Sequence, residues 1–294
     1  MYKKIFILIM VIIIIIVIIY IKNITLYDPQ KAIPAKYKRF FRKLSLLTES
    51  NDNIINELVK TPDNIFLDTI YLRNNDTNNC IIYFHGNSGN ISLRYNIIKF
   101  LYNYASVVAF DYRSYGRSSG DHNFLSNKKL FIDAKTIWNY CIYTLRIHPN
   151  NISFFGESLG CGIAINLAAE ISKNSSVEFY PHSLILNSPF LSLKSMVQDI
   201  CCDMELEFLG KILSLLFFNE YQSDKLVPYI NHHTKIIISH SLNDEIIPFD
   251  HGINLFNILS QTHPNAQFIT INGSHNNLGV SDEYIYTLAN IFND

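Results

Sequence analysis

The stretch Ile152-Ser153-Phe154-Phe155-Gly156-Glu157-Ser158-Leu159-Gly160 contains the strongest structural signal in the chain. Its first four residues are mostly β-branched or aromatic, which is typical of a buried strand, and residues 161–169 have the small, apolar character of a buried helix. A Gly-x-Ser-x-Gly segment between a strand and a helix predicts a strained turn that presents the serine hydroxyl, with glycine wherever a bulkier residue would collide with neighbouring chain. We therefore predict that Ser158 is a nucleophile.

The helix that follows this turn predicts a site for negative charge. Its free N–H groups and its dipole point toward the serine, where they would stabilise charge that develops on a substrate oxygen. Leu159 can supply one such N–H. Because His85-Gly86-Asn87-Ser88-Gly89-Asn90 directly follows the apolar run 80–84, we predict the backbone N–H of Asn87 as the second donor. His85 is interpreted as a residue that fixes this turn rather than as a base.

Two downstream residues are predicted to activate the serine. Asp244 follows the apolar run 235–239 and His275 follows the run 267–271, so each should lie in a loop just beyond a late strand. The order Ser158, Asp244, His275 is the order of hydrolases whose nucleophile occupies such a turn. We predict that His275 takes the serine proton and that Asp244 orients the imidazole and stabilises its cation. Glu245 is excluded as the acid.

Strands and helices are expected to alternate along the chain. Short β-branched or aromatic runs predict strands at 65–72, 80–84, 106–110, 152–155, 183–186, 235–239 and 267–271. Helices are expected near 90–103, 127–145, 158–173, 250–260 and 282–292. This alternation predicts an α/β protein with a mostly parallel sheet and helices on both faces. Residues 190–230 are rich in apolar side chains and are interpreted as a small helical lid, although an ordinary packed helix pair would have the same stripe.

Six segments resemble those of the membrane-associated ABHD-type α/β-hydrolases. They are the 85–90 loop, Asp111-Tyr112-Arg113-Ser114-Tyr115-Gly116-Arg117-Ser118-Ser119-Gly120, the serine turn, Asn187-Ser188-Pro189-Phe190, the Asp244 loop and Gly273-Ser274-His275-Asn276. The resemblance implies the α/β-hydrolase fold and a serine-hydrolase activity on carboxylic esters or thioesters. The apolar N-terminus looks like that of the single-pass members, whereas Pro248-Phe249-Asp250-His251-Gly252 looks more like the protein depalmitoylases.

The N-terminus predicts a membrane anchor. Residues 5–21 are an uninterrupted apolar run, which as a helix would span roughly 25 Å, near the lower limit for crossing a bilayer. We expect a short tail at 1–4, a transmembrane anchor at 5–21, a basic amphipathic stem at 22–62 and a hydrolase domain at 63–294. The excess of Lys and Arg after the run favours a single-pass membrane protein with a cytosolic globular part. Alternatively, the stem lies on the membrane surface through Phe40 and Leu44.

Composition and spacing exclude several classes of function. A net charge of -1 argues against nucleic-acid binding, which needs a clustered positive surface. The five cysteines lack the spacing of a metal site or a disulfide scaffold, so we expect no metal and no other cofactor. The favoured function is a membrane-anchored serine hydrolase whose substrate is a lipid or an acylated protein. The alternative is a catalytically silent hydrolase fold that serves as a tethered interaction module.

Overall fold

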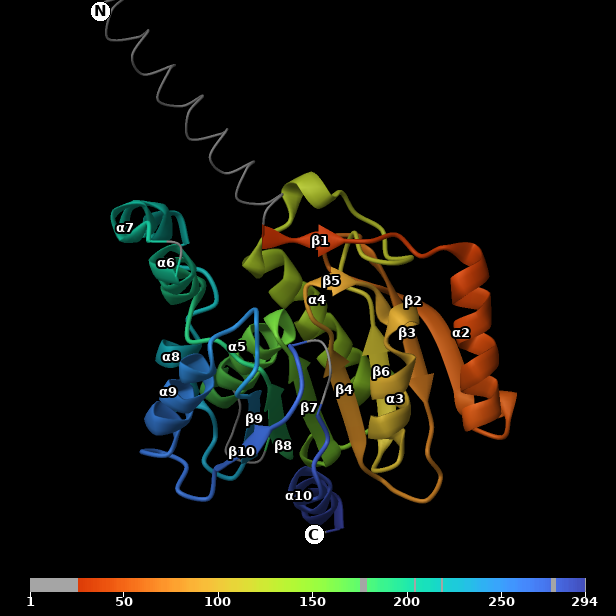
Figure 1. The fold of residues 1–294 in the computed structure, drawn as a ribbon. Coiled ribbons are helices and arrows are strands. Elements are labelled where there is room, and N and C mark those ends of the chain that lie inside the picture. The colour runs from red at the N-terminus through yellow and green to blue at the C-terminus, as the bar shows by residue number, and fades with distance from the viewer. Residues whose placement is uncertain (1–25, 175–178, 204, 218, 276–278, 294) are drawn as a thin grey trace, which may run out of the picture.

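The computed structural model describes residues 26–174, 179–203, 205–217, 219–275 and 279–293, and within them eight strands form one central sheet in the order β10-β9-β8-β7-β4-β6-β3-β2 (Figure 1). These strands are β2 (Ile54–Lys60), β3 (Phe66–Leu72), β4 (Cys80–Phe84), β6 (Ser106–Phe110), β7 (Ile152–Glu157), β8 (Ser183–Asn187), β9 (Lys235–Ser241) and β10 (Gln267–Ile271). All neighbours from β6 to β10 pair in parallel, whereas β3 is antiparallel to both of its neighbours. The predicted α/β class with a mostly parallel sheet is confirmed.

Helices cover both faces of this sheet. One face carries α4 (Asn127–Asn139), α5 (Leu159–Asn174) and α9 (Phe249–Leu259), and the other carries α2 (Pro34–Leu47), α3 (Tyr95–Tyr102) and α10 (Asp282–Asn293). Successive strand residues point to opposite sides, so Ile82 belongs to the first apolar cluster and its neighbour Ile81 to the second. Because both faces are covered, the inner strands are buried at nearly every position and rich in apolar residues, which is why the sequence predicts them well.

Most predicted elements coincide with observed ones. The strands predicted at 80–84, 106–110 and 267–271 have the predicted bounds. The edge strand β2 was not predicted. Its sequence, Ile-Ile-Asn-Glu-Leu-Val-Lys, mixes polar and apolar residues and most of its side chains are exposed, so it has no apolar run of the kind that identifies an inner strand.

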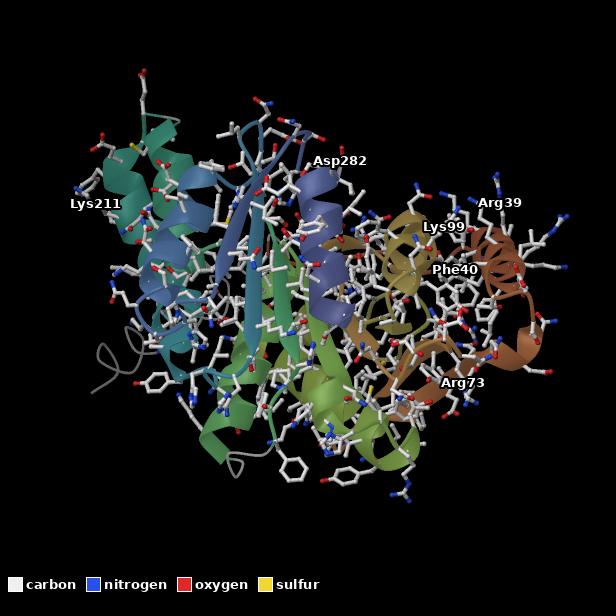
Figure 2. The ribbon with its side chains drawn as sticks, turned by 90° about the horizontal axis from the view of Figure 1, so that it is seen from below. Arg39, Phe40, Arg73, Lys99, Lys211 and Asp282 are labelled. Atoms are coloured by element: carbon white, nitrogen blue, oxygen red, sulfur yellow. The ribbon has the colours of Figure 1, made fainter. Side chains whose placement is uncertain are left out.

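Helix α2 packs against the sheet beside α3. Phe40 and Leu44 are buried and belong to the same apolar cluster as α3 and α10. Figure 2 shows Phe40 on the side of α2 that faces α3, while Arg39 points away from the core. Phe40 and Leu44 of the predicted stem therefore pack inside the fold, whereas Leu46 is exposed. Residues 26–62 are part of the same fold as the rest of the chain, because they supply β2 to the sheet and buried side chains to the clusters on both of its faces.

The predicted lid stretch contains helices α6 (Leu193–Asp203), α7 (Glu207–Ser214) and α8 (Ser223–Leu226). Helices α6 and α7 pack against each other and project from the body of the molecule (Figure 1). Phe208 of α7 is 78% exposed, as expected for a helix that has domain contacts on one side only. A second, two-stranded sheet pairs β1 (Asp28–Pro29) with β5 (Ser88–Gly89) in parallel, just beyond the end of β4.

The predicted single-pass membrane localisation is wrong. In the part of the chain that the structure describes, no helix is both long and apolar enough to cross a bilayer. The longest described helix, α5, has 16 residues and therefore rises only about 24 Å, which is less than the roughly 30 Å of a hydrocarbon core. Residues 5–21, which were expected to form the anchor, lie outside the described residues.

Candidate active site

Ser158 occupies the turn between β7 and α5 with a left-handed backbone conformation, φ 54°. Such a φ is strained for a residue with a side chain and persists only where the surroundings enforce it. The two flanking glycines explain how: a Cβ on Gly160 would lie 2.0 Å from the carbonyl oxygen of Phe84, and a Cβ on Gly156 would lie 2.7 Å from Cα of Cys161. Close approach of the backbone segments thus requires glycine at both positions.

The sheet brings Ser158, Asp244 and His275 together. Each residue follows the carboxyl end of a different strand, namely β7, β9 and β10. Oγ of Ser158 lies 3.0 Å from Nε2 of His275, and Nδ1 of His275 lies 2.9 and 2.8 Å from the two carboxylate oxygens of Asp244. A hydroxyl, an imidazole and a carboxylate therefore form one continuous chain of hydrogen bonds.

Asp244 supplies the negative charge at the end of this chain. Burial by itself would raise the pKa of its carboxyl, but hydrogen bonds from His240, from His275 and from the N–H of Ile247 together hold that pKa well below its usual range. An ionised carboxylate can only accept hydrogen bonds, so Nδ1 of His275 carries its proton. Nε2 of His275 is then free to accept the hydroxyl proton of Ser158.

Two further residues support the pair of Asp244 and His275, and neither was predicted to do so. His240, buried in β9, places Nε2 3.4 Å from a carboxylate oxygen of Asp244 and 3.0 Å from the carbonyl oxygen of Ile247. Glu245, which was excluded as the acid, accepts the backbone N–H of His275 at 3.0 Å. The sequence offers only a weak signal for His240, which stands between Ser239 and Ser241 directly after the apolar residues 236–238.

The predicted oxyanion donors belong to two different segments next to the serine. Leu159 is the first residue of α5, and Asn87 lies in the loop after β4. Both residues line the same cavity as Ser158. Among the described residues, neither backbone N–H has a protein acceptor. Two such N–H groups beside a nucleophile can stabilise negative charge on a substrate oxygen.

His85 is a buried, neutral histidine. Its Nδ1 lies 2.7 Å from the carbonyl oxygen of Gly86, to which it donates, and its ring packs on Tyr112 with ring centroids 4.3 Å apart. Burial, together with the nearby Arg94 charge, lowers the pKa of His85 to about 3. These contacts support its interpretation as a residue that fixes the 85–90 loop.

An apolar cavity of about 320 Å³ opens beside Ser158. It is lined by Leu26, Asn87, Ser158, Leu159, Phe190, Leu193, Met196, Val197, Ile200, Phe217, Ile246 and Ile247. Helix α6 supplies four of these side chains, so the lid forms one wall of the cavity. Aliphatic and aromatic walls around a few polar groups are typical of a site that binds an apolar ligand.

Comparison with known proteins finds a viral relative and several lipases. No family model matches it. It is 63% identical, over its whole length and the whole of the relative, to uncharacterized protein R595 of Acanthamoeba polyphaga mimivirus. It is 29% identical to lysophosphatidylserine lipase ABHD12 of Danio rerio over 73% of this chain and 57% of that protein. The chain thus spans about half the length of the lysophosphatidylserine lipases that it matches.

Solved structures share the fold. The α/β-hydrolase of Vibrio vulnificus matches with a TM-score of 0.65 at 18% identity, over 90% of this chain and 94% of that one. The Pyrococcus furiosus esterase Pf2001 matches with a TM-score of 0.61 at 18% identity, over 85% of this chain and 90% of that one. The chain belongs to the family of the mimivirus protein. Its fold is that of the α/β-hydrolases, and its similarity to ABHD12 supports an ABHD-type member of that fold. Its lipase and esterase relatives support an ester-hydrolysing function.

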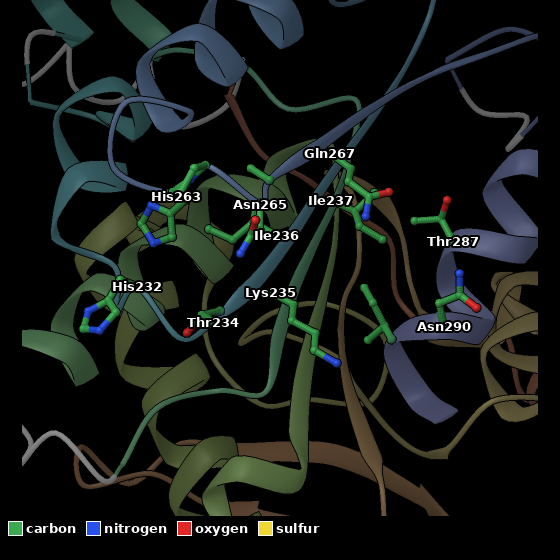
Figure 3. A pocket seen from close by; sticks show the side chains of 13 residues that line it. His232, Thr234, Lys235, Ile236, Ile237, His263, Asn265, Gln267, Thr287 and Asn290 are labelled. Atoms are coloured by element: carbon green, nitrogen blue, oxygen red, sulfur yellow. The ribbon is translucent and has the colours of Figure 1, made fainter. Parts of the chain in front are cut away.

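The protein has a second, more polar pocket at the opposite end of the strands, where β9 and β10 begin. Figure 3 shows Lys235 and Gln267, the first residues of β9 and β10, together with His232, His263 and Asn290 around it. Substrates of α/β proteins bind beyond the carboxyl ends of the strands, and Ser158 lies at that end of the sheet. Among the described residues, no group of three or more His, Cys, Asp or Glu side chains is arranged to hold a metal ion.

Proposed function

We propose that this ABHD-type hydrolase cleaves carboxylic esters of acylated lipids, with Ser158 as nucleophile, His275 as base and Asp244 as the group that orients His275. The observation that carries the proposal is the 3.0 Å approach of Ser158 Oγ to Nε2 of His275 at the mouth of an apolar cavity. A nucleophile within hydrogen-bond reach of a base that a third group orients is the geometry that nucleophilic catalysis needs.

Acylation comes first. Oγ of Ser158 attacks the acyl carbon while its proton passes to Nε2 of His275, and the backbone N–H groups of Asn87 and Leu159 stabilise the oxyanion that forms. The carboxylate of Asp244 stabilises the imidazolium. The tetrahedral intermediate then collapses, the bond to the alcohol breaks, and the departing alcohol takes the proton from His275.

Deacylation repeats the same steps with water. His275 removes a proton from water as the water oxygen attacks the acyl-serine carbon, and the same two N–H groups stabilise the second oxyanion. Collapse of this intermediate returns the proton to Oγ of Ser158 and releases a carboxylic acid. Each turnover therefore consumes one water and one ester, and regenerates the enzyme.

The cavity beside Ser158 supports an acyl chain as the bound part of the substrate. Its walls are aliphatic and aromatic, and Asn87 and Ser158 are the polar residues at its lining. The similarity to lysophosphatidylserine lipases supports a lipid that carries an acyl ester, such as a lysophospholipid. We propose oxygen esters rather than thioesters as the substrates, because the named relatives are lipases and esterases.

Labelling with a fluorophosphonate probe tests the nucleophile. We expect the folded wild-type protein to be labelled, Ser158→Ala to be unlabelled, and the matched control Ser260→Ala, in which the serine follows α9, to be labelled as wild type. A folded wild-type protein that stays unlabelled, or equal labelling of Ser158→Ala, would overturn the proposal and favour a catalytically silent fold.

Product release from a panel of substrates tests the bond that is cleaved. The panel contains p-nitrophenyl esters of increasing chain length, lysophospholipids, acyl thioesters and an S-acylated peptide. We expect turnover of oxygen esters with medium and long acyl chains. Turnover of the thioesters or of the S-acylated peptide alone would contradict the ester assignment while leaving the role of Ser158 intact.

A further inference from the structure

We propose that residues 26–30, here called the N-terminal strap, and Tyr115 are positioning elements of the active site that orient the oxyanion donor Asn87. The inference rests on the proposed function, because it assigns the strap a part in the same reaction. The strap precedes the first strand of the main sheet and follows directly on the part of the chain that is not described. It nevertheless lies next to the loop that carries Asn87.

The side-chain oxygen of Asn87 is held from two directions. The backbone N–H of Asp28 donates to Oδ1 of Asn87 at 3.2 Å, and the hydroxyl of Tyr115 donates to the same oxygen at 3.0 Å. A backbone N–H can only donate, so the atom of Asn87 that faces it must be the oxygen. Two donors that converge on one oxygen restrict the rotation of this side chain and, through it, the orientation of the Asn87 peptide.

Further bonds fasten the strap to the same loop. Asp28 and Pro29 pair in parallel with Ser88 and Gly89. The hydroxyl of Ser88 donates to a carboxylate oxygen of Asp28 at 2.6 Å, so the residue next to Asn87 is tied down as well. These bonds span about sixty positions of sequence, and they lie outside the main sheet that sets the direction of β4. The strap therefore adds restraints to this loop beyond those that β4 provides.

The other end of the strap reaches the cavity and the base of the lid. Leu26 lines the cavity beside Ser158. The hydroxyls of Tyr27 and Tyr221 lie 3.0 Å apart in a buried contact, and Tyr221 lies two residues before the start of α8. The strap thus connects the oxyanion loop to the segment that returns from the lid, and Leu26 closes one side of the acyl-binding cavity.

Orientation of an oxyanion donor affects the transition state more than the bound substrate. Complete loss of one donor lowers kcat by roughly 100- to 1,000-fold, because the N–H acts only where charge develops. A donor that is retained but held less firmly should lose part of that effect. We therefore expect loss of the Tyr115 hydroxyl to lower kcat by roughly 5- to 20-fold, with KM nearly unchanged.

A double-mutant cycle in the full-length protein tests the inference. Tyr115→Phe removes one donor, and Asn87→Ala removes the acceptor while keeping the backbone N–H of residue 87. If Tyr115 acts through Asn87, the double variant will be no slower than Asn87→Ala on p-nitrophenyl butyrate, because the hydroxyl then has nothing left to orient. Tyr102→Phe is the matched control, since its hydroxyl donates to the carbonyl oxygen of Arg73 instead, and it should keep wild-type kcat.

Three outcomes would overturn the inference. They are wild-type kcat in Tyr115→Phe, a rise in KM without a fall in kcat, and full additivity of the two substitutions. If Tyr115→Phe does not fold, Asn87→Ala alone decides. The side chain of Asn87 is half-buried and not part of the core, so this variant should fold. Wild-type kcat in Asn87→Ala would refute the role of the Oδ1 contacts. A failure of the proposed function is distinguished by wild-type protein that neither reacts with fluorophosphonate nor turns over the ester.

Discussion

Asp244 contacts Nδ1 of His275 through both of its carboxylate oxygens, at 2.9 and 2.8 Å, although 31 positions separate the two residues. The same carboxylate also accepts the N–H groups of Ile246 and Ile247, which fix its plane. With the carboxylate immobile, the imidazole has one preferred tautomer and one preferred orientation. The proposed base is therefore pre-organised before a substrate arrives.

We expect Asp244→Asn to keep the shape of this contact and to lose its function. A neutral amide can offer its N–H to Nδ1, which favours the wrong tautomer of His275 and removes the charge that stabilises the imidazolium. By analogy with other serine hydrolases, kcat should fall by roughly 10,000-fold. The rate of p-nitrophenol release from a p-nitrophenyl ester will measure this loss. An Asp244→Asn variant within tenfold of wild type would show that another group orients His275.

Filling the cavity beside Ser158 should change chain-length preference. Val197 lines that cavity from α6, and a tryptophan there would occupy the space assigned to the acyl chain. We expect Val197→Trp to lower kcat/KM for octanoyl and longer esters by about tenfold or more and to leave acetyl esters nearly unaffected. Lys211→Ala, on the outward-pointing α7, serves as control (Figure 2). A uniform loss across all chain lengths would contradict an acyl-binding cavity.

Gly160 should tolerate no side chain. A methyl group at this position would overlap the carbonyl oxygen of Phe84. The turn at residue 160 and the end of β4 are both backbone, so neither can move aside without disturbing the fold. We expect Gly160→Ala to cost roughly 3 kcal/mol or more of the free energy of unfolding. Thermal unfolding will measure it against Gly86→Ala, whose added Cβ would make ordinary contacts at 3.5 Å or more. Equal Tm values for the two variants would contradict the observed crossing of the segments.

His85 should make stability depend on pH. Burial lowers the pKa of His85 in the folded protein to about 3, whereas an unfolded histidine titrates near 6.5. Below about pH 6.5 the unfolded chain therefore binds a proton that the folded chain does not, and the free energy of unfolding falls by about 1.4 kcal/mol per pH unit from this residue. Stability is complete above that range and is lost progressively toward pH 3.

Urea unfolding of wild type and His85→Asn at several pH values tests this linkage. Between pH 6 and pH 4 the wild type should lose roughly 2–3 kcal/mol more stability than the variant, which has no group that titrates in this range at position 85. Parallel pH profiles for the two proteins would show that His85 is not held neutral by the fold.

Much of the fold could be predicted because the inner strands are buried on both faces. Residues 80–84, 106–110 and 267–271 are apolar enough to define β4, β6 and β10 with correct bounds. The strand β2 escaped prediction because it lies at an exposed edge, where no apolar run is required. The position of α2 was also unpredictable from its amphipathic pattern, since Phe40 and Leu44 would look the same on a lipid surface as they do against α3.

The sequence by itself determined the turn at Ser158 and the order in which Ser158, Asp244 and His275 follow three strands. Both are local properties, because steric crowding dictates the glycines and each loop directly follows an apolar run. Only the tertiary structure decided that Ser158 and His275, 117 positions apart, come within 3.0 Å, and that His240 lies beside Asp244. Only it placed Asp28 and Tyr115 on Asn87, because such contacts depend on strand order and on how distant loops pack, which no short stretch of sequence encodes.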